Sequence, residues 1–288
     1  MSILSSVEKI IVHAGSCHDD EIVAISLALA TMGYLVDVFR RDPTPEELNN
    51  PNVLVMDVGG IHNPSDLCFD HHQLARDAAP TNAASLLVDA LGLTKAFELQ
   101  GWWASFVELD SKGPFAVAKT LGLESFPFAL QSPLGSALKN TIANMEEIPE
   151  PFLQVLMEMG QQLINEAKSL ASDLEAAKAS VHVLGHQGIT INVWDSALSS
   201  AASTAFRDQQ LEKAGVLVCR DDRGPGWTLY RYDDHERVDF SILAGRDNVT
   251  FAHAGGFICK TAEMTMLQAL NLARLAISPT TEPEESPF

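Results

Sequence analysis

The chain has 288 residues, 46% of them hydrophobic, which is enough for two ordinary globular domains. Its 38 acidic and 19 basic residues give a formal net charge of −19, so most of its surface would repel a long nucleic-acid duplex. The four cysteines form no C-x-x-C pair, which argues against a disulfide framework or a structural zinc site. No signal-peptide pattern and no apolar run of about twenty residues is present, which predicts a cytoplasmic protein without a membrane span.

Strands and helices alternate at the start of the chain. Residues 9–12 and 53–56 are short apolar runs that predict buried strands, and a further strand is expected at 35–39. Residues 20–32 have the pattern of an amphipathic helix that ends at Gly33. This alternation predicts an α/β fold with a parallel sheet, helices on both of its faces, and ligands at the carboxyl ends of the strands.

Helices dominate the middle of the chain, and strands return after it. Helices are expected at 81–91, 95–109, 132–145 and 150–179, strands at 180–184, 189–194, 215–220 and 227–232, and a final helix at 261–276. The turn at 221–226 has the composition of a hairpin connection. The long helix is interpreted either as a connector or as the surface of a homodimer.

Four segments follow from this pattern. An N-terminal α/β domain with a parallel sheet is expected over residues 1–125, a helical connector over 126–180, and a smaller C-terminal α/β domain over 181–277. The last segment, 278–288, is rich in Pro, Thr and Glu and predicts a disordered tail. Substrate is expected between the two domains.

Histidine and aspartate residues gather at the ends of the predicted N-terminal elements. These residues are His13, His18, Asp20, Asp57, Asp70, His71, His72 and Asp110. Any one of them alone is weak support for a site, but together they have the composition of a metal centre. Two divalent ions about 3.5–4 Å apart require a bridging carboxylate with further ligands on either side. Mixed imidazole and carboxylate ligands favour Mn²⁺, with Mg²⁺, Co²⁺ or Fe²⁺ as alternatives.

At these residues the sequence resembles the DHH phosphoesterase superfamily and, within it, the melanocyte-proliferating-gene family. The matching patterns are H-x-G-x-x-H-x-D-E at 13–21, D-V-G-G at 57–60, D-H-H-Q at 70–73 and F-x-H-x-x-G-F-I at 251–258. The resemblance implies a DHH-type catalytic domain and a two-metal phosphoesterase activity.

The resemblance also implies roles for individual residues. The expected metal ligands are His13, His18, Asp20, Asp57, His71 and Asp110. Asp57 is expected to bridge the two ions. Asp70 and His72 are the expected catalytic residues, with Asp70 orienting His71 and His72 lying beside the scissile phosphate as a proton donor.

The C-terminal domain is expected to bind the substrate. His253, Gly255 and Gly256 form a turn in which backbone N–H groups could approach an oxyanion, and Arg246 and Lys260 flank it. On the glycines alone, an ordinary turn before the last helix fits equally well. The match of His253 to the family pattern favours phosphate binding.

Three functions are compatible with these features. The resemblance favours a 3'–5' exonuclease or oligoribonuclease acting on short single-stranded RNA. The net charge favours a phosphatase or phosphodiesterase acting on a small nucleotide or dinucleotide, because few phosphates would then need to be held. The third hypothesis is a non-catalytic binding protein with a vestigial site, which the complete ligand set disfavours.

Overall fold

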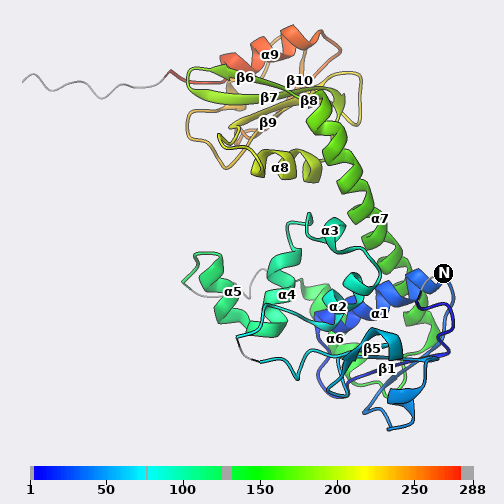
Figure 1. Ribbon diagram of the computed structural model, residues 1–288. Helices are drawn as coiled ribbons and strands as arrows, with labels where there is room; N and C mark the ends of the chain where they lie inside the picture. Colours follow the sequence, from blue (N-terminus) through cyan, green and yellow to red (C-terminus); the bar gives the residue numbers. More distant parts are fainter. Residues whose placement is uncertain (1–2, 76, 125–131, 280–288) are drawn as a thin grey trace, which may run out of the picture. The chain divides into compact units, whose positions relative to one another are not determined.

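The computed structural model describes residues 3–75, 77–124 and 132–279. The chain divides into two compact units, Met1–Ser169 and Leu170–Phe288 (Figure 1). Both units combine a sheet with helices, so the predicted α/β class is confirmed. Among the described residues, no helix combines the length and apolar character that a membrane crossing requires.

The first unit is built on a five-stranded sheet with the strand order β2-β1-β3-β5-β4. Its strands are β1 (Lys9–Val12), β2 (Asp37–Arg40), β3 (Val53–Met56), β4 (His62–Asn63) and β5 (Cys68–Phe69). The first three and β5 run parallel, as predicted, and the edge strand β4 runs antiparallel to β5. The carboxyl ends of β1, β3 and β5 therefore lie at one edge of the sheet.

The helices of this unit are α1 (Asp19–Met32), α2 (Ala83–Ala90), α3 (Thr94–Phe97), α4 (Trp103–Lys112), α5 (Pro114–Thr120), α6 (Pro133–Ala143) and α7 (Glu150–Ser180). Helices α1, α2 and the first part of α7 share one apolar core with the sheet. The expectation of helices on both faces was wrong for the described residues. On the opposite face, Ile11 and Val55 pack with Leu48, which lies in the 3₁₀ turn Glu47–Asn49. The reason is that only this short turn connects β2 to β3.

The helices of this unit show one break that was not predicted and one unusually close contact. The single helix expected at 95–109 is two helices, because a turn through Gly101 separates α3 from α4. Helix α7 packs closely on α1, since a Cβ atom on Gly160 would lie 2.0 Å from the carbonyl oxygen of Ser26. Only glycine permits this approach.

The second unit contains a six-stranded sheet with the order β10-β11-β9-β8-β7-β6. Its strands are β6 (His182–His186), β7 (Ile189–Ala197), β8 (Val216–Arg220), β9 (Trp227–Arg231), β10 (Val249–Ala252) and β11 (Ile258–Thr261). The predicted hairpin between β8 and β9 is confirmed by their antiparallel register. Strands β7 and β8 are parallel, and α8 (Ser200–Asp208) connects them.

The two faces of this sheet carry different helices (Figure 1). Helix α9 (Met266–Leu275) covers one face and forms a core with Val216 and Val218. On the other face, Leu217 and Cys219 pack with Trp194 and with Phe206 of α8. The expected final helix begins later than predicted, because Thr261 still belongs to β11 and Thr265 caps the helix. The predicted disordered tail lies outside the described residues, except for residues 278 and 279.

Candidate metal centre

The loop between β1 and α1 carries the first histidines of the site. His13 directly follows β1, and His18 is the residue before α1. Arg40, at the end of β2, holds this loop by donating to the carbonyl oxygens of Gly15 and Ser16 at 3.2 to 3.3 Å. Its Nε also donates to the buried carboxylate of Glu21 at 2.8 Å. The sequence interpretation missed Arg40. In the sequence, two features could have indicated its role. Arg40 is a cation at the end of a predicted strand, and Glu21 is an acidic residue of the first motif with no assigned role.

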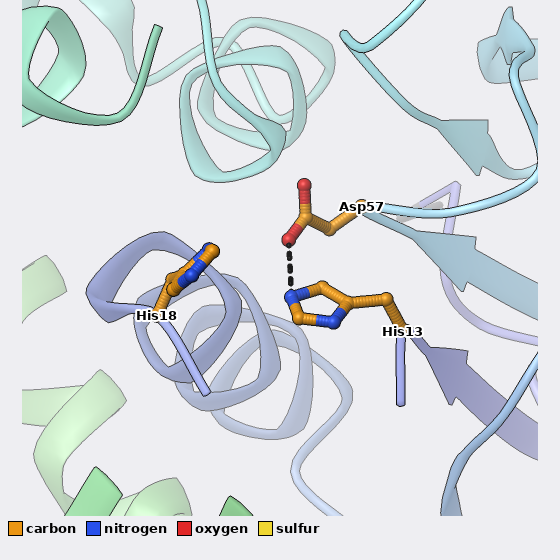
Figure 2. A group of neighbouring side chains, drawn as sticks. All are labelled: His13, His18 and Asp57. Carbon is orange, nitrogen blue, oxygen red and sulfur yellow. Dashed lines mark ion pairs between the residues drawn. The ribbon is translucent and has the colours of Figure 1, made fainter. Parts of the chain in front are cut away.

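Asp57 lies at the centre of the site. It follows β3 with a φ of 60°, in the left-handed region that aspartate tolerates better than most residues, and its side chain is buried. Its Oδ2 lies 3.2 Å from Nε2 of His13, and its Oδ1 lies 3.2 Å from Nε2 of His71. Figure 2 shows His13 and His18 converging on this carboxylate from the loop after β1. The two oxygens of Asp57 therefore face two different imidazoles.

The Asp70-His71-His72 triplet follows β5. The buried carboxylate of Asp70 accepts from the backbone N–H of Gly60 at 2.6 Å and from that of His72 at 3.0 Å. It also accepts from Nδ1 of His72 at 2.7 Å. Asp70 thus orients His72, whereas the sequence interpretation had it orient His71. The reason is that His71 turns in the other direction, toward Asp57 and Asp110.

Two further carboxylates complete the cluster from helices. Asp20, in the first turn of α1, is 1% exposed, and Asp110 lies in α4. Asp110 has Oδ2 at 3.0 Å from Nε2 of His71 and Oδ1 at 3.7 Å from Nδ1 of His18. Donor atoms of His18, Asp20 and Asp110 all lie within 4.8 Å of one another. The structure thus brings together all six residues that the sequence proposed as ligands.

The charges of the cluster shift the pKa values of its members strongly. Asp57 raises the pKa of His13 to about 9, against the effect of burial. Burial lowers the pKa of His71, but Asp110 and Asp57 outweigh it and raise that pKa to about 10. Burial, with the charges of Asp57 and Asp110, raises the pKa of Asp20 well above its ordinary value. Without a metal ion, the site therefore draws in protons to balance its carboxylates.

Although burial opposes it, pairing with His13 and His71 lowers the pKa of Asp57 to about 2. Asp57 therefore keeps its charge at neutral pH. An ionised carboxylate between two imidazoles is also what a shared metal ligand requires.

Several nitrogen and oxygen atoms of the cluster that could bind a metal have no hydrogen-bond partner in the described part of the chain. They are Nε2 of His13, Oδ1 of Asp20, both oxygens of Asp57, Nε2 of His71 and Oδ2 of Asp110. The imidazole and carboxylate groups contact one another as ion pairs at 3.0 to 3.2 Å. A buried polar atom without a partner costs about 1–3 kcal/mol. Coordination of divalent cations would satisfy all of these atoms, so this donor set fits metal ions.

The residues expected to bind substrate lie in and around strands β10 and β11. His253, Gly255 and Gly256 make the predicted turn after β10. However, the N–H of Gly255 already donates to Nδ1 of His253 at 2.9 Å, and that of Gly256 donates to the carbonyl oxygen of His253 at 2.8 Å. Arg246 is exposed in the loop before β10, and Lys260 pairs with Asp221. The turn therefore uses the N–H groups of both glycines internally, and their role in substrate binding stays a prediction.

Comparisons with known proteins bear on the first unit. Residues 9–91 match the model of an uncharacterised protein family, UPF0160, the melanocyte proliferating gene 1 family. The predicted resemblance is confirmed over these residues. The matched stretch contains His13, Asp57 and the 70–72 triplet. No curated protein matches the chain.

Among solved structures, a match is RecJ in complex with Mg²⁺ from Thermus thermophilus, with 13% sequence identity. The alignment covers 95% of this chain and 50% of the RecJ chain, so this chain spans half the length of that protein. The TM-score of 0.28 is too low to establish a common fold.

Proposed function

We propose that this chain is a divalent-metal-dependent phosphodiester hydrolase, a 3'–5' exonuclease or oligoribonuclease that acts on short single-stranded RNA. One observation carries the proposal. Asp57 is buried, stays ionised, and presents each of its two carboxylate oxygens to a different histidine. A carboxylate in this position is suited to bridge two cations, as the phosphoryl chemistry of two-metal enzymes requires.

The proposed metal ligands are His13, His18, Asp20, Asp57, His71 and Asp110, with Mn²⁺ as the preferred ion. When bound, the ions supply an activated water and neutralise charge on the phosphoryl oxygens. The chain's own contribution is to hold the donor atoms in place. Arg40 holds the loop between His13 and His18 in place by donating to its carbonyl oxygens. The N–H of Gly60 holds the 70–72 triplet in place by donating to the carboxylate of Asp70.

His72 is proposed to donate a proton to the leaving oxygen. Its Nδ1 lies 3.8 Å from Oδ1 of Asp57, but it bonds to Asp70 at 2.7 Å. This bond leaves Nε2 as the ring nitrogen that can hold a transferable proton. The side chain is 59% exposed, so substrate can reach it. These features favour the role of proton donor for His72 over that of metal ligand.

Two cavities adjoin the cluster within the first unit. One of about 580 Å³ has His71, Pro80, Glu108 and Lys112 among its lining residues. Another of about 550 Å³ is lined by His13, His18, Asp57, His72 and their neighbours. Each has the volume of a nucleotide-sized ligand. The net charge of −19 continues to favour short substrates, so a small nucleotide or dinucleotide is the second candidate.

The test is hydrolysis of a substrate panel with Mn²⁺ and with Mg²⁺: a 5'-labelled RNA of about five nucleotides, dinucleotides, a phosphatase ester and pyrophosphate. Stepwise release of nucleoside monophosphates from the RNA, weakened by added salt, would support the exonuclease. Turnover of dinucleotides or esters alone would favour the small-nucleotide enzyme. No turnover with any ion would contradict both.

Asp57→Ala should abolish this activity, because it removes the carboxylate whose two oxygens contact His13 and His71 separately. The matched control is Asp37→Ala, an exposed aspartate on β2 that should keep wild-type activity. Circular dichroism should show both variants folded. Retained activity in folded Asp57→Ala would overturn the bridging role.

A further inference from the structure

The second unit contains a cavity of its own. It has a volume of about 420 Å³ and lies between the beginning of α8 and the face of the sheet opposite α9. Its walls include Ser203 of α8, Cys219 of β8, Tyr230 of β9 and Lys260 of β11. None of the metal ligands lines it, and of the residues expected to bind substrate only Lys260 does. The cavity therefore needs an explanation separate from the metal centre.

Basic side chains are concentrated here in a chain that has only 19 of them. Arg220, Arg223 and Lys260 all line the cavity. Nε of Arg220 bonds to Asp195 at 2.7 Å, and Lys260 pairs with Asp221. Since a guanidinium has five N–H donors and an ammonium has three, both groups keep donors for a ligand. Arg220 also stacks on Trp227, with its guanidinium carbon 4.2 Å from the ring centroid, which holds it in place.

Helix α8 directs its first turn at the same cavity. Ser199 caps the helix by accepting from the N–H of Ala202 at 3.2 Å, and Ser199, Ser200 and Ser203 line the wall. In the described residues, the N–H groups of Ser200 and Ala201 have no partner. Free N–H groups and the positive end of a helix dipole favour an anion at this point.

Tyr232 supplies an independent sign of a ligand. Its side chain lines the cavity and the residue is 5% exposed, yet its hydroxyl has no hydrogen-bond partner in the described part of the structure. Ser203 lies beside it and donates its own hydroxyl to the carbonyl oxygen of Ser200 at 3.0 Å. An unsatisfied buried hydroxyl costs about 1–3 kcal/mol, which a bound acceptor would recover.

We propose that this cavity binds the phosphate group of a small phosphomonoester of about mononucleotide size. The phosphate lies at the first turn of α8, where Lys260, Arg220 and the hydroxyl of Tyr232 donate to its oxygens. Asp222 is the one carboxylate among the lining residues of the described chain, and it is 3.8 Å from Lys260, which offsets its charge. The volume matches pockets that take ligands of this size.

The test is isothermal titration calorimetry of the full chain with AMP, inorganic phosphate and adenosine, both with Mn²⁺ and after EDTA treatment. In EDTA, where the metal centre is empty, AMP and phosphate should each bind at one site per chain, and adenosine should not bind; this site should persist when Mn²⁺ is added. Tyr232→Phe should weaken AMP binding about tenfold, because it removes one donor to a charged group. Its thermal midpoint should not fall, since it deletes only an unpaired hydroxyl.

Lys260→Gln should weaken binding at least as much. The matched controls are Tyr34→Phe, whose hydroxyl donates to the Val7 carbonyl in the first unit, and Lys213→Gln, whose ammonium pairs with Asp208 outside the cavity. Both should bind AMP like the wild type.

Two results would overturn the proposal: no saturable binding of AMP or phosphate, or wild-type affinity in both Tyr232→Phe and Lys260→Gln. Loss of AMP binding in Asp57→Ala would move the ligand to the metal centre and would also overturn it. Because binding is measured without metal, this test can fail while the proposed hydrolase activity stands, and the reverse also holds.

Discussion

The substitution Asp20→Asn should show whether Asp20 is a metal ligand or a carboxylate that stabilises the fold. If Asp20 is a ligand, the loss of stability should appear only when metal is present. In the metal-free protein, Asp20 is a buried carboxylate whose pKa is raised by burial and by the charges of Asp57 and Asp110. Asparagine has the same shape and can still accept the 3.4 Å hydrogen bond from the N–H of Ala83. The free energy of unfolding of the metal-free variant should therefore stay within about 1 kcal/mol of the wild type, or rise.

With metal present, the same substitution removes a ligand. At a metal concentration of 100 times Kd, binding stabilises the wild type by about 2.7 kcal/mol. If the variant binds about 100-fold more weakly, the same concentration stabilises it by only about 0.4 kcal/mol. For a unit of this size, the Mn²⁺-induced rise in Tm should fall from about 5–11 °C to about 1–2 °C.

The assay is thermal unfolding followed by circular dichroism, in EDTA and in MnCl₂. The control is Asp19→Asn, the preceding residue, whose side chain is 52% exposed and which should respond to Mn²⁺ like the wild type. Equal stabilisation of Asp20→Asn and wild type by Mn²⁺ would refute the ligand role. A large loss of stability in EDTA would show instead that Asp20 holds the fold.

Three further outcomes follow from the contacts. Arg40→Met should lower the free energy of urea unfolding by about 3–5 kcal/mol, because it leaves Glu21 buried without its arginine partner. The matched change at the half-buried Arg41, Arg41→Met, should cost under about 1 kcal/mol, and equal effects would contradict this. Gly256→Ala should cost about 1–3 kcal/mol, since its φ is 70° and a Cβ atom would lie 2.3 Å from Oδ1 of Asp239; an unchanged thermal midpoint would show that the turn can relax. In the wild type, EDTA should lower the Tm of the first unit and leave that of the second unchanged, and a shift of both would place metal elsewhere.

Much of the first unit could be predicted from local patterns. The apolar runs at 9–12 and 53–56 are short, and a glycine or an aspartate follows closely, so they predict buried parallel strands, which the structure contains. Because the carboxyl ends of parallel strands share one edge, the positions of His13 and Asp57 at that edge followed as well. The two-residue strand β5 was not predicted, since so short a run has no recognisable period.

The sequence by itself therefore determined the fold class and the edge of the sheet where a site would form. The family resemblance named the six expected ligands, and the tertiary structure decided how their side chains are arranged around Asp57. Asp110 lies in a helix with no local mark of function, and it joins the cluster because α4 packs beside α1. Asp70 bonds to His72 because the Gly60 turn lies against it. Arg40 and the cavity around Tyr232 likewise depend on contacts between distant segments, which hydrophobic periodicity does not encode.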